Sequence, residues 1–109
     1  MIRALAAGLL LSMMSLAAPA GELRSDVGTN DNPLYEKECG SCHFAYQARW
    51  LPERSWRKLM GELSSHFGEN AELPAPTRDA ITQWLAANAA DHSTNERSRE
   101  ILKAIPPGT

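Results

Sequence analysis

Two cysteines and a histidine fall within five consecutive residues of this chain, a spacing that suits attachment of a metal cofactor. Cys39 and Cys42 are separated by two residues, and His43 follows the second cysteine directly. Two thiols at this spacing can add to the two vinyl groups on one edge of a porphyrin, and the histidine is then held under the iron as an axial ligand. The pattern C-x-x-C-H is the attachment signature of a c-type haem, so the segment predicts one covalently bound haem c.

Other uses of the cysteine pair fit the sequence less well. A thioredoxin-like redox pair needs a βαβ setting, and the sequence has no strand pattern. A zinc site needs a second pair of Cys or His residues at ligand spacing, which is missing. A simple disulfide between Cys39 and Cys42 would leave the adjacent His43 without a role.

A second axial ligand for the iron can come from three side chains. If residues 52–67 form a helix, His66 borders its apolar stripe in the last turn, where a side chain can reach over a haem face. Met60 lies inside that stripe, where methionine is more often core filler, and His92 follows the next helix. Position favours His66, while His92, Met60 and an iron with no second protein ligand stay open as alternatives.

The first twenty residues have the pattern of a secretory signal peptide. Arg3 precedes an apolar run over residues 4–16, and Ala18 and Ala20 form an A-x-A cleavage pattern. The apolar run is too short to cross a bilayer as an uncleaved anchor, and no later segment is apolar enough to span. We therefore expect cleavage after Ala20, export to the periplasm and no stable membrane insertion afterwards.

Size and charge place the exported chain among small single-domain proteins. Removal of the leader from the 109 residues leaves 89, which is near the lower limit for a self-sufficient apolar core. A covalently held haem would supply a large apolar group around which short helices pack. The formal net charge is −2, and it becomes −3 when Arg3 is removed with the leader. No basic cluster is visible, so nucleic acid is not expected as a partner.

Helix signals predict an all-α, cytochrome c-like domain over residues 33–109, preceded by a flexible lead-in over 21–32. Asn32 and Pro33 mark a helix start that runs to Cys39. An irregular link follows, and further helices are expected over 52–67, over 77–90 after a stiff connector at 73–76, and from a capping box at 93–96 to 105. Gly68 is the expected stop of the second helix, and its expected apolar stripe contains Trp56, Leu59, Met60, Leu63 and Phe67.

Several stretches together resemble the N-terminal part of the bacterial dihaem cytochrome c family. These are residues 39–43, 51–56, 66–71, 75–77 and 86–89. The outline is also similar to class I cytochromes c, in which a helix ends in the haem motif. The resemblance implies ligation by two histidines, with His43 proximal and His66 distal. It also implies a membrane b-type cytochrome or a small oxygen-binding cytochrome of the periplasm as redox partner.

One departure from the family bears on the function. The family carries a second C-x-x-C-H in a C-terminal segment, whereas this sequence contains one such motif. We expect a single-haem relative, or a shortened two-haem protein, that carries single electrons from a quinol-linked membrane component to a periplasmic acceptor and is not an enzyme. If His66 does not bind the iron, the alternative is a five-coordinate haem protein that binds a small gas or peroxide. Trp50, Trp56 and Trp84 are candidate haem-packing groups.

Overall fold

The computed structural model describes residues 30–109, and within this range it contains four α-helices, three short 3₁₀ turns and no strand. The prediction of an all-α domain is confirmed. The predicted signal peptide over 1–20, and the lead-in up to residue 29, lie outside the described residues. The elements are α1 (Pro33–Cys39), η1 (Ala48–Trp50), α2 (Glu53–Gly61), η2 (Leu63–Ser65), α3 (Ala75–Ala87), η3 (Ala90–His92) and α4 (Glu96–Ala104).

The first helix, α1, has the predicted bounds. The side chain of Asn32 accepts a hydrogen bond from the Tyr35 backbone N–H at 3.1 Å. Pro33 occupies the first turn, where backbone N–H groups have no acceptor within the helix, so a residue without an N–H is tolerated there. The helix ends at Cys39, and the Gly40 N–H closes the last turn. Cys39, which carries the first thiol of the haem motif, is therefore the last residue of α1, and the rest of the motif lies in the loop that follows.

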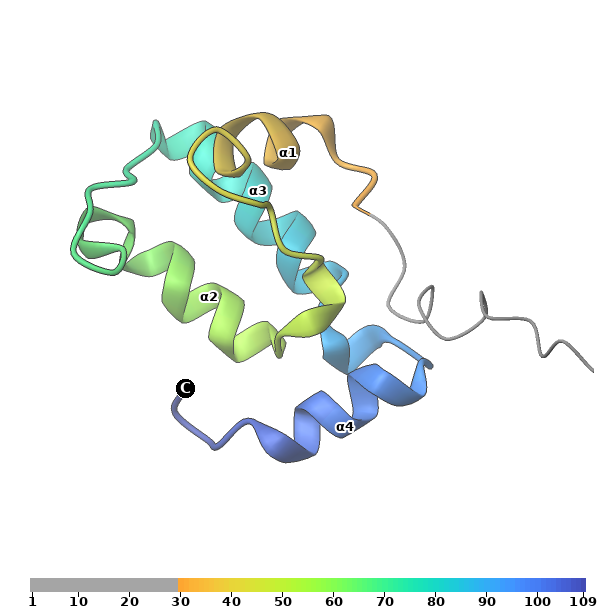
Figure 1. Ribbon diagram of the computed structural model, residues 1–109. Coiled ribbons are helices and arrows are strands. Elements are labelled where there is room, and N and C mark those ends of the chain that lie inside the picture. The colour runs from red at the N-terminus through yellow and green to blue at the C-terminus, as the bar shows by residue number, and fades with distance from the viewer. Residues whose placement is uncertain (1–29) are drawn as a thin grey trace, which may run out of the picture.

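The apolar core lies between α1, α2 and α3, and α2 packs directly against α3 (Figure 1). Ile81 and Leu85 of α3 are completely buried. The Tyr35 ring stands edge-on to Trp56, with ring centroids 6.4 Å apart, and tilts against Trp84 at 5.3 Å. The Trp56 indole N–H donates to the Ala48 carbonyl at 2.7 Å, so its one polar group is satisfied inside the core.

The last helix, α4, packs against η1 and η3, and the chain then returns to α2 (Figure 1). Ser98 of α4 is fully buried and donates to the Arg49 carbonyl at 3.3 Å. At the C-terminal end, the Ser55 hydroxyl donates to the Thr109 carbonyl at 2.6 Å and the Lys58 ammonium donates to the Gly108 carbonyl at 2.9 Å. Side chains of α2 thus fix the position of the C-terminal segment.

The helix predicted over 52–67 is wrong in its second half. α2 ends at Gly61, where glycine is about 1 kcal/mol less favourable than alanine in a helix. The chain continues through η2 into a tight turn, in which the His66 N–H donates to the Glu69 carbonyl at 2.8 Å and the Glu69 N–H donates to the His66 carbonyl at 3.0 Å. Phe67 is 88 % exposed in this turn, so its predicted place in the buried stripe is also wrong.

Two other predicted boundaries are shifted. α3 begins at Ala75, before the predicted start at residue 77, because Pro76 is tolerated in the first turn of a helix. It ends at Ala87, and η3 occupies the rest of the predicted helix. The N-cap of α4 is Asn95, whose side chain accepts from the Arg97 N–H at 2.9 Å, so the predicted capping box starting at Ser93 is wrong.

Leu85→Ala should lower the free energy of unfolding by about 2–5 kcal/mol, because truncating a fully buried leucine leaves a cavity. Gln83→Ala, on the exposed face of the same helix, should change that free energy by less than about 0.5 kcal/mol. Denaturant unfolding of the haem-loaded protein measures both. Equal losses in the two variants would contradict the placement of the core.

The N-terminus of α2 is held by η3, which lies far away in the sequence. The Glu53 N–H donates to Asp91 Oδ2 at 2.7 Å, which supplies the side-chain cap that the N-cap residue Pro52 cannot give. His92 Nε2 lies 3.0 Å from Glu53 Oε2, and Arg57 donates to Glu53 Oε1 at 2.8 Å. The hydrogen bonds from His92 and Arg57 lower the pKa of the Glu53 carboxyl.

A lowered folded-state pKa means that the ionised Glu53 stabilises the fold above the ordinary glutamate pKa, and that this contribution is lost as the pH falls through the lowered value. Glu53→Gln should therefore be less stable than the parent near neutral pH and should lose less further stability between about pH 5 and 3. Glu62→Gln, at an exposed position, is the matched control. Thermal unfolding across this pH range measures the effect, and parallel curves for E53Q and the parent would argue against it.

Candidate haem site

The two thiols and the first histidine of the motif lie at the end of α1 and in the turn that follows. Cys39 is half-buried as the last residue of α1, and both Cys42 and His43 are exposed. Both cysteines are free thiols. Burial, with smaller contributions from the carboxylates of Glu38 and Glu36, raises the pKa of the Cys39 thiol.

A backbone hydrogen bond orients the imidazole of His43. Its Nδ1 lies 2.8 Å from the Phe44 carbonyl oxygen. Because a carbonyl oxygen can only accept, Nδ1 carries the proton and the lone pair of Nε2 is free for a metal. Metal-binding histidines usually have their other ring nitrogen held in this way.

His66 lies opposite His43. The two imidazole centroids are 6.1 Å apart, and the ring planes differ by 16°. A centroid distance of 6.1 Å is longer than that of two imidazoles stacked directly over one another in van der Waals contact, which would be about 3.5–4 Å. His66 reaches this place from the extended start of the tight turn, at φ −70° and ψ 94°, and not from a helix as the sequence suggested.

The structure places the other two candidate ligands elsewhere. His92 pairs with Glu53 at the first turn of α2, at the opposite end of that helix from the turn that carries His66. Met60 is buried in the core cluster, as expected of a methionine within an apolar stripe.

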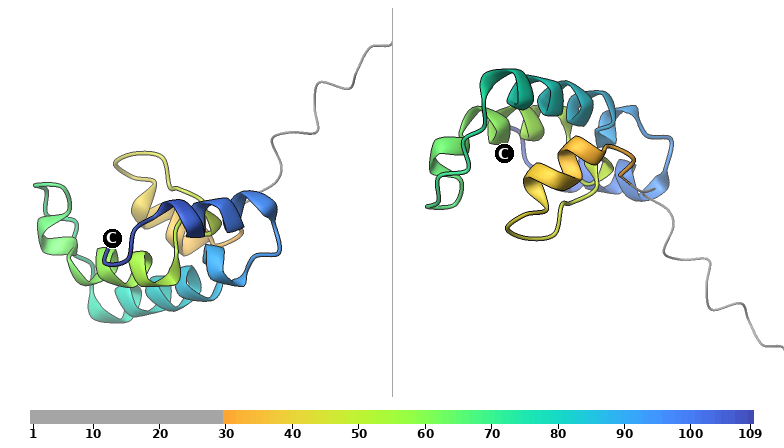
Figure 2. Two further views of the ribbon diagram at one scale, coloured as in Figure 1. Left: turned by 90° about the horizontal axis from the view of Figure 1, so that it is seen from below. Right: turned by 90° about the horizontal axis from the view of Figure 1, so that it is seen from above.

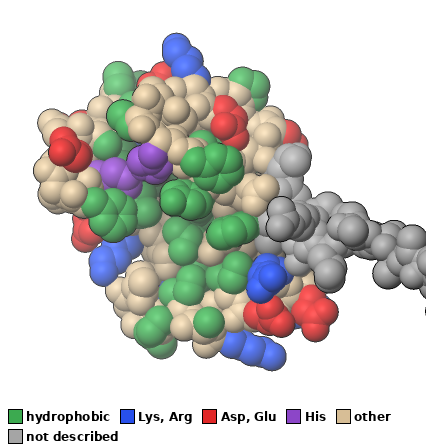
Figure 3. Space-filling model, in the orientation of Figure 1, with side chains coloured by type: hydrophobic (Ala, Val, Ile, Leu, Met, Phe, Trp, Pro, Cys, Tyr) green, Lys and Arg blue, Asp and Glu red, His purple; other side chains and the backbone are tan. Residues whose placement is uncertain are grey.

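Exposed aromatic rings continue outward from the two histidines. Tyr46 lies 6.0 Å from His43 and packs edge-on against Phe44 at 5.6 Å, and Phe67 packs edge-on against His66 at 4.8 Å. These five residues form the exposed ring cluster. Figure 3 shows histidine side chains next to one another on the front face, with hydrophobic side chains gathered beside and below them. Phe44 and Phe67 are 69 % and 88 % exposed, and such a gathering marks a place where another group binds.

The loop that carries Phe44 and Tyr46 is anchored from two sides. The Tyr35 hydroxyl donates to the Tyr46 carbonyl at 2.6 Å, and burial raises the pKa of this tyrosine. The Asn30 amide donates to the Ala45 carbonyl at 3.1 Å. Both anchors were missed from the sequence, since nothing in the local pattern distinguishes Tyr35 or Asn30 from an ordinary helix or lead-in residue.

The loop after the haem motif and the loop after α2 lie on the same side of the molecule, opposite α3 (Figure 2). Of the three tryptophans proposed to pack on the haem, Trp56 is a core residue, Trp84 is partly buried against that core, and Trp50 is exposed. Trp50 is thus the tryptophan with most surface free for another group.

The residues fit a covalently held haem c. The two free thiols have the spacing for thioether links. The His43 and His66 imidazoles lie close together with nearly parallel planes, and the hydrogen bond at His43 Nδ1 leaves the lone pair of its Nε2 free for iron. The exposed aromatic rings nearby offer apolar surface to a flat apolar group. Among residues 30–109, no group of three or more Cys, His, Asp and Glu side chains could hold a bare metal ion. Histidine is a common axial ligand of haem iron, so a histidine pair suits a porphyrin-bound iron.

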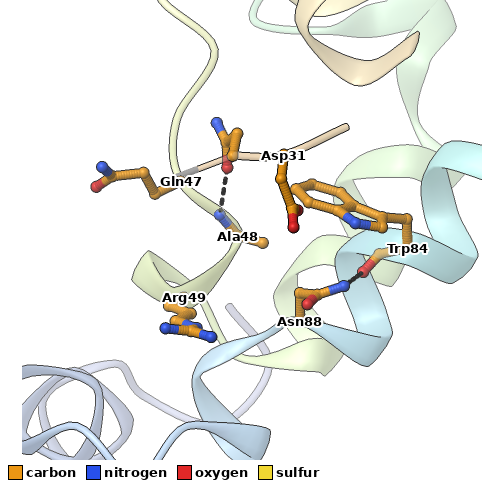
Figure 4. A pocket seen from close by; sticks show the side chains of 7 residues that line it. Asp31, Gln47, Ala48, Arg49, Trp84 and Asn88 are labelled. Atoms are coloured by element: carbon orange, nitrogen blue, oxygen red, sulfur yellow. Dashed lines mark hydrogen bonds between the residues drawn. The ribbon is translucent and has the colours of Figure 1, made fainter. Parts of the chain in front are cut away.

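A separate hollow lies between the lead-in, η1 and the end of α3 (Figure 4). Its wall includes a hydrogen bond from the Ala48 N–H to Asn30 Oδ1 at 3.3 Å and another from the Asn88 amide to the Trp84 carbonyl at 2.9 Å. None of its lining residues is a cysteine or histidine, so it is not part of the haem site. The lining residues are Asn30, Asp31, Gln47, Ala48, Arg49, Trp84 and Asn88.

Gly40→Ala should reduce covalent haem incorporation several-fold. A Cβ at this position would clash with the Glu36 carbonyl oxygen, so the last turn of α1 would have to open and shift Cys42 relative to Cys39. Ser41, at the other variable position of the motif, is exposed, so the Ser41→Ala variant should incorporate as much haem as the parent. The haem-to-protein absorbance ratio and the intact mass of the exported protein measure loading. Full loading of G40A would show that the glycine is not required.

Solved structures and one family model match this chain. The family model is that of the dihaem cytochrome c, and it matches residues 35–106. A diheme cytochrome c from Rhodobacter sphaeroides is 43 % identical with a TM-score of 0.64, and the match covers 72 % of this chain and 61 % of that one. DHC purified from the same organism is 39 % identical with a TM-score of 0.57, covering 72 % and 78 %.

A diheme cytochrome type c from Shewanella baltica OS155 is 34 % identical with a TM-score of 0.55, and the match covers 72 % of this chain and 66 % of that one. No curated protein matches the chain. The part of the first Rhodobacter sphaeroides structure that this chain spans is 61 % of its length.

Proposed function

Because this chain belongs to the dihaem cytochrome c family, whose members are electron-transfer proteins with haem c, we propose that residues 30–109 carry single electrons through one haem held by histidines on both faces. The observation that carries this proposal is the facing pair of His43 and His66 imidazoles, 6.1 Å apart and nearly parallel. The family name denotes two haems, and the single C-x-x-C-H of this sequence provides for the attachment of one haem.

Each residue of the site has a distinct role in this proposal. Cys39 and Cys42 form the thioether links, His43 is the proximal ligand and His66 the distal ligand. When bound, haem c supplies an iron that alternates between Fe(III) and Fe(II). Two histidine ligands leave no open position for a substrate, which favours electron transfer over catalysis. Histidine in place of methionine as the distal ligand gives a lower reduction potential.

The location and partners belong to the same proposal. Residues 1–20 act as a cleaved signal peptide and the mature chain works in the periplasm. Among the residues the structure describes, no helix is long and apolar enough to span a membrane. The exported chain, with a formal charge of −3 after loss of Arg3 from a total of −2, suits a redox partner with a basic surface. We propose a membrane b-type cytochrome or a small periplasmic cytochrome as that partner.

His66→Ala should convert a low-spin haem spectrum into a high-spin one, and the ferrous form should then bind carbon monoxide. Met60→Ala is a poor control because Met60 is buried, whereas His92→Ala removes an exposed histidine and should leave the spectrum low-spin. Absorption spectra of the oxidised and reduced exported proteins measure both variants.

Three outcomes would count against the proposal. If H66A keeps a low-spin spectrum, His66 is not the distal ligand. If H92A loses the low-spin spectrum, His92 is the distal ligand in place of His66. A parent protein whose ferrous spectrum already shifts with carbon monoxide would favour a five-coordinate, gas-binding haem. An exported chain without a haem-sized mass increase would exclude haem attachment altogether.

A further inference from the structure

Phe67 occupies a position in the tight turn that the backbone disfavours for a bulky side chain. Its φ is +51° and that of Gly68 is +87°, and these two residues are the centre of a turn closed by both hydrogen bonds between His66 and Glu69. Turns with two positive φ values favour Asn-Gly, and a phenylalanine at such a position is an outlier. Burial does not compensate for this, because the Phe67 side chain is almost fully exposed.

The His66 imidazole, in contrast to that of His43, has no hydrogen bond to hold it among the described residues. The Nδ1 of His43 is fixed by the Phe44 carbonyl at 2.8 Å, and such a bond is the usual way in which a metal-binding imidazole is oriented. Apart from the facing imidazole of His43, the aromatic contact on the His66 ring is Phe67, at a centroid distance of 4.8 Å and an interplanar angle of 71°. This is the edge-to-face geometry that aromatic pairs prefer.

We propose that Phe67 is a positioning residue that fixes the plane of the His66 imidazole by an edge-to-face contact, in place of the missing hydrogen bond. The inference rests on the proposed role of His66 as distal ligand. The strained turn presents the ring beside His66, and the ring restricts rotation of the imidazole about its χ2 angle. The effect is to keep the two imidazole planes nearly parallel, 16° apart, and to hold His66 over its site.

The test separates the ring from the backbone. Phe67→Asn removes the ring and suits a positive φ, so the turn should form at least as well as in the parent. Phe67→Gly is a second ring-less variant with the same freedom, and Phe67→Tyr retains the ring. Haem-loaded proteins are compared by the g-value anisotropy of the low-spin ferric EPR signal, which reports the angle between the axial imidazole planes, and by titration with cyanide, which competes with His66.

Loss of the aromatic contact should change the EPR anisotropy in F67N and F67G and tighten cyanide binding about two- to tenfold, since an aromatic pair contributes on that scale. F67Y should match the parent in both measurements. Parental behaviour of both ring-less variants, an equal change in F67Y, or loss of haem from both ring-less variants would each overturn the inference.

The failure of this inference can be told apart from that of the proposed function. If the parent is low-spin through His66 and F67N is unchanged, only the role of Phe67 is wrong. If the parent is not low-spin, or if H66A leaves it low-spin, the distal role of His66 fails and the role of Phe67 fails with it.

Discussion

The close, nearly parallel approach of two imidazoles sets demands on two segments that are separated in the sequence by the link after His43, by all of α2 and by η2. The loop that carries His43 must leave α1 in a fixed direction. The Asn32 cap at the start of that seven-residue helix and Gly40 at its end fix this direction. His66 must arrive from the other end of α2, and a closed turn of four residues provides it. Neither segment is long enough to hold its place alone, so both depend on the core beneath them.

That core connects the two loops through Tyr35. Its ring packs against Trp56 and Trp84 between the helices, while its hydroxyl donates to the backbone of the loop that carries Phe44 and Tyr46. One residue of α1 thus belongs both to the packed interior and to the support of the exposed ring cluster. One residue can fill both roles because, in a domain this small, a single side chain spans the distance between the core and the surface loop.

The features that were predictable from the sequence are those with short-range causes. The bounds of α1 follow from Asn32, Pro33 and the haem motif itself, and the existence of α3 follows from its periodicity. The last helix was predicted from a capping box starting at Ser93, and α4 is present although its N-cap is Asn95. The early end of α2 was missed although Gly61 is a local signal for it, because Leu63 continues the apolar spacing beyond the glycine. Leu63 is indeed buried, but it lies in a 3₁₀ turn. The cap on α2 comes from Asp91, 38 residues away, and no local pattern signals such a contact. His66 was selected as the residue opposite His43 on the assumption of a helix, and the structure brings it there through a turn.

The way in which the two histidines are supported also bears on how fast an electron can be exchanged. The His43 imidazole is bonded to a backbone carbonyl of its own loop, and His66 starts a turn that is closed on itself by two backbone hydrogen bonds. If both histidines ligate the iron as proposed, backbone supports of this kind can stay in place in the oxidised and in the reduced state. Electron exchange would then require little nuclear reorganisation, and its rate would be set mainly by the distance to the partner and the driving force.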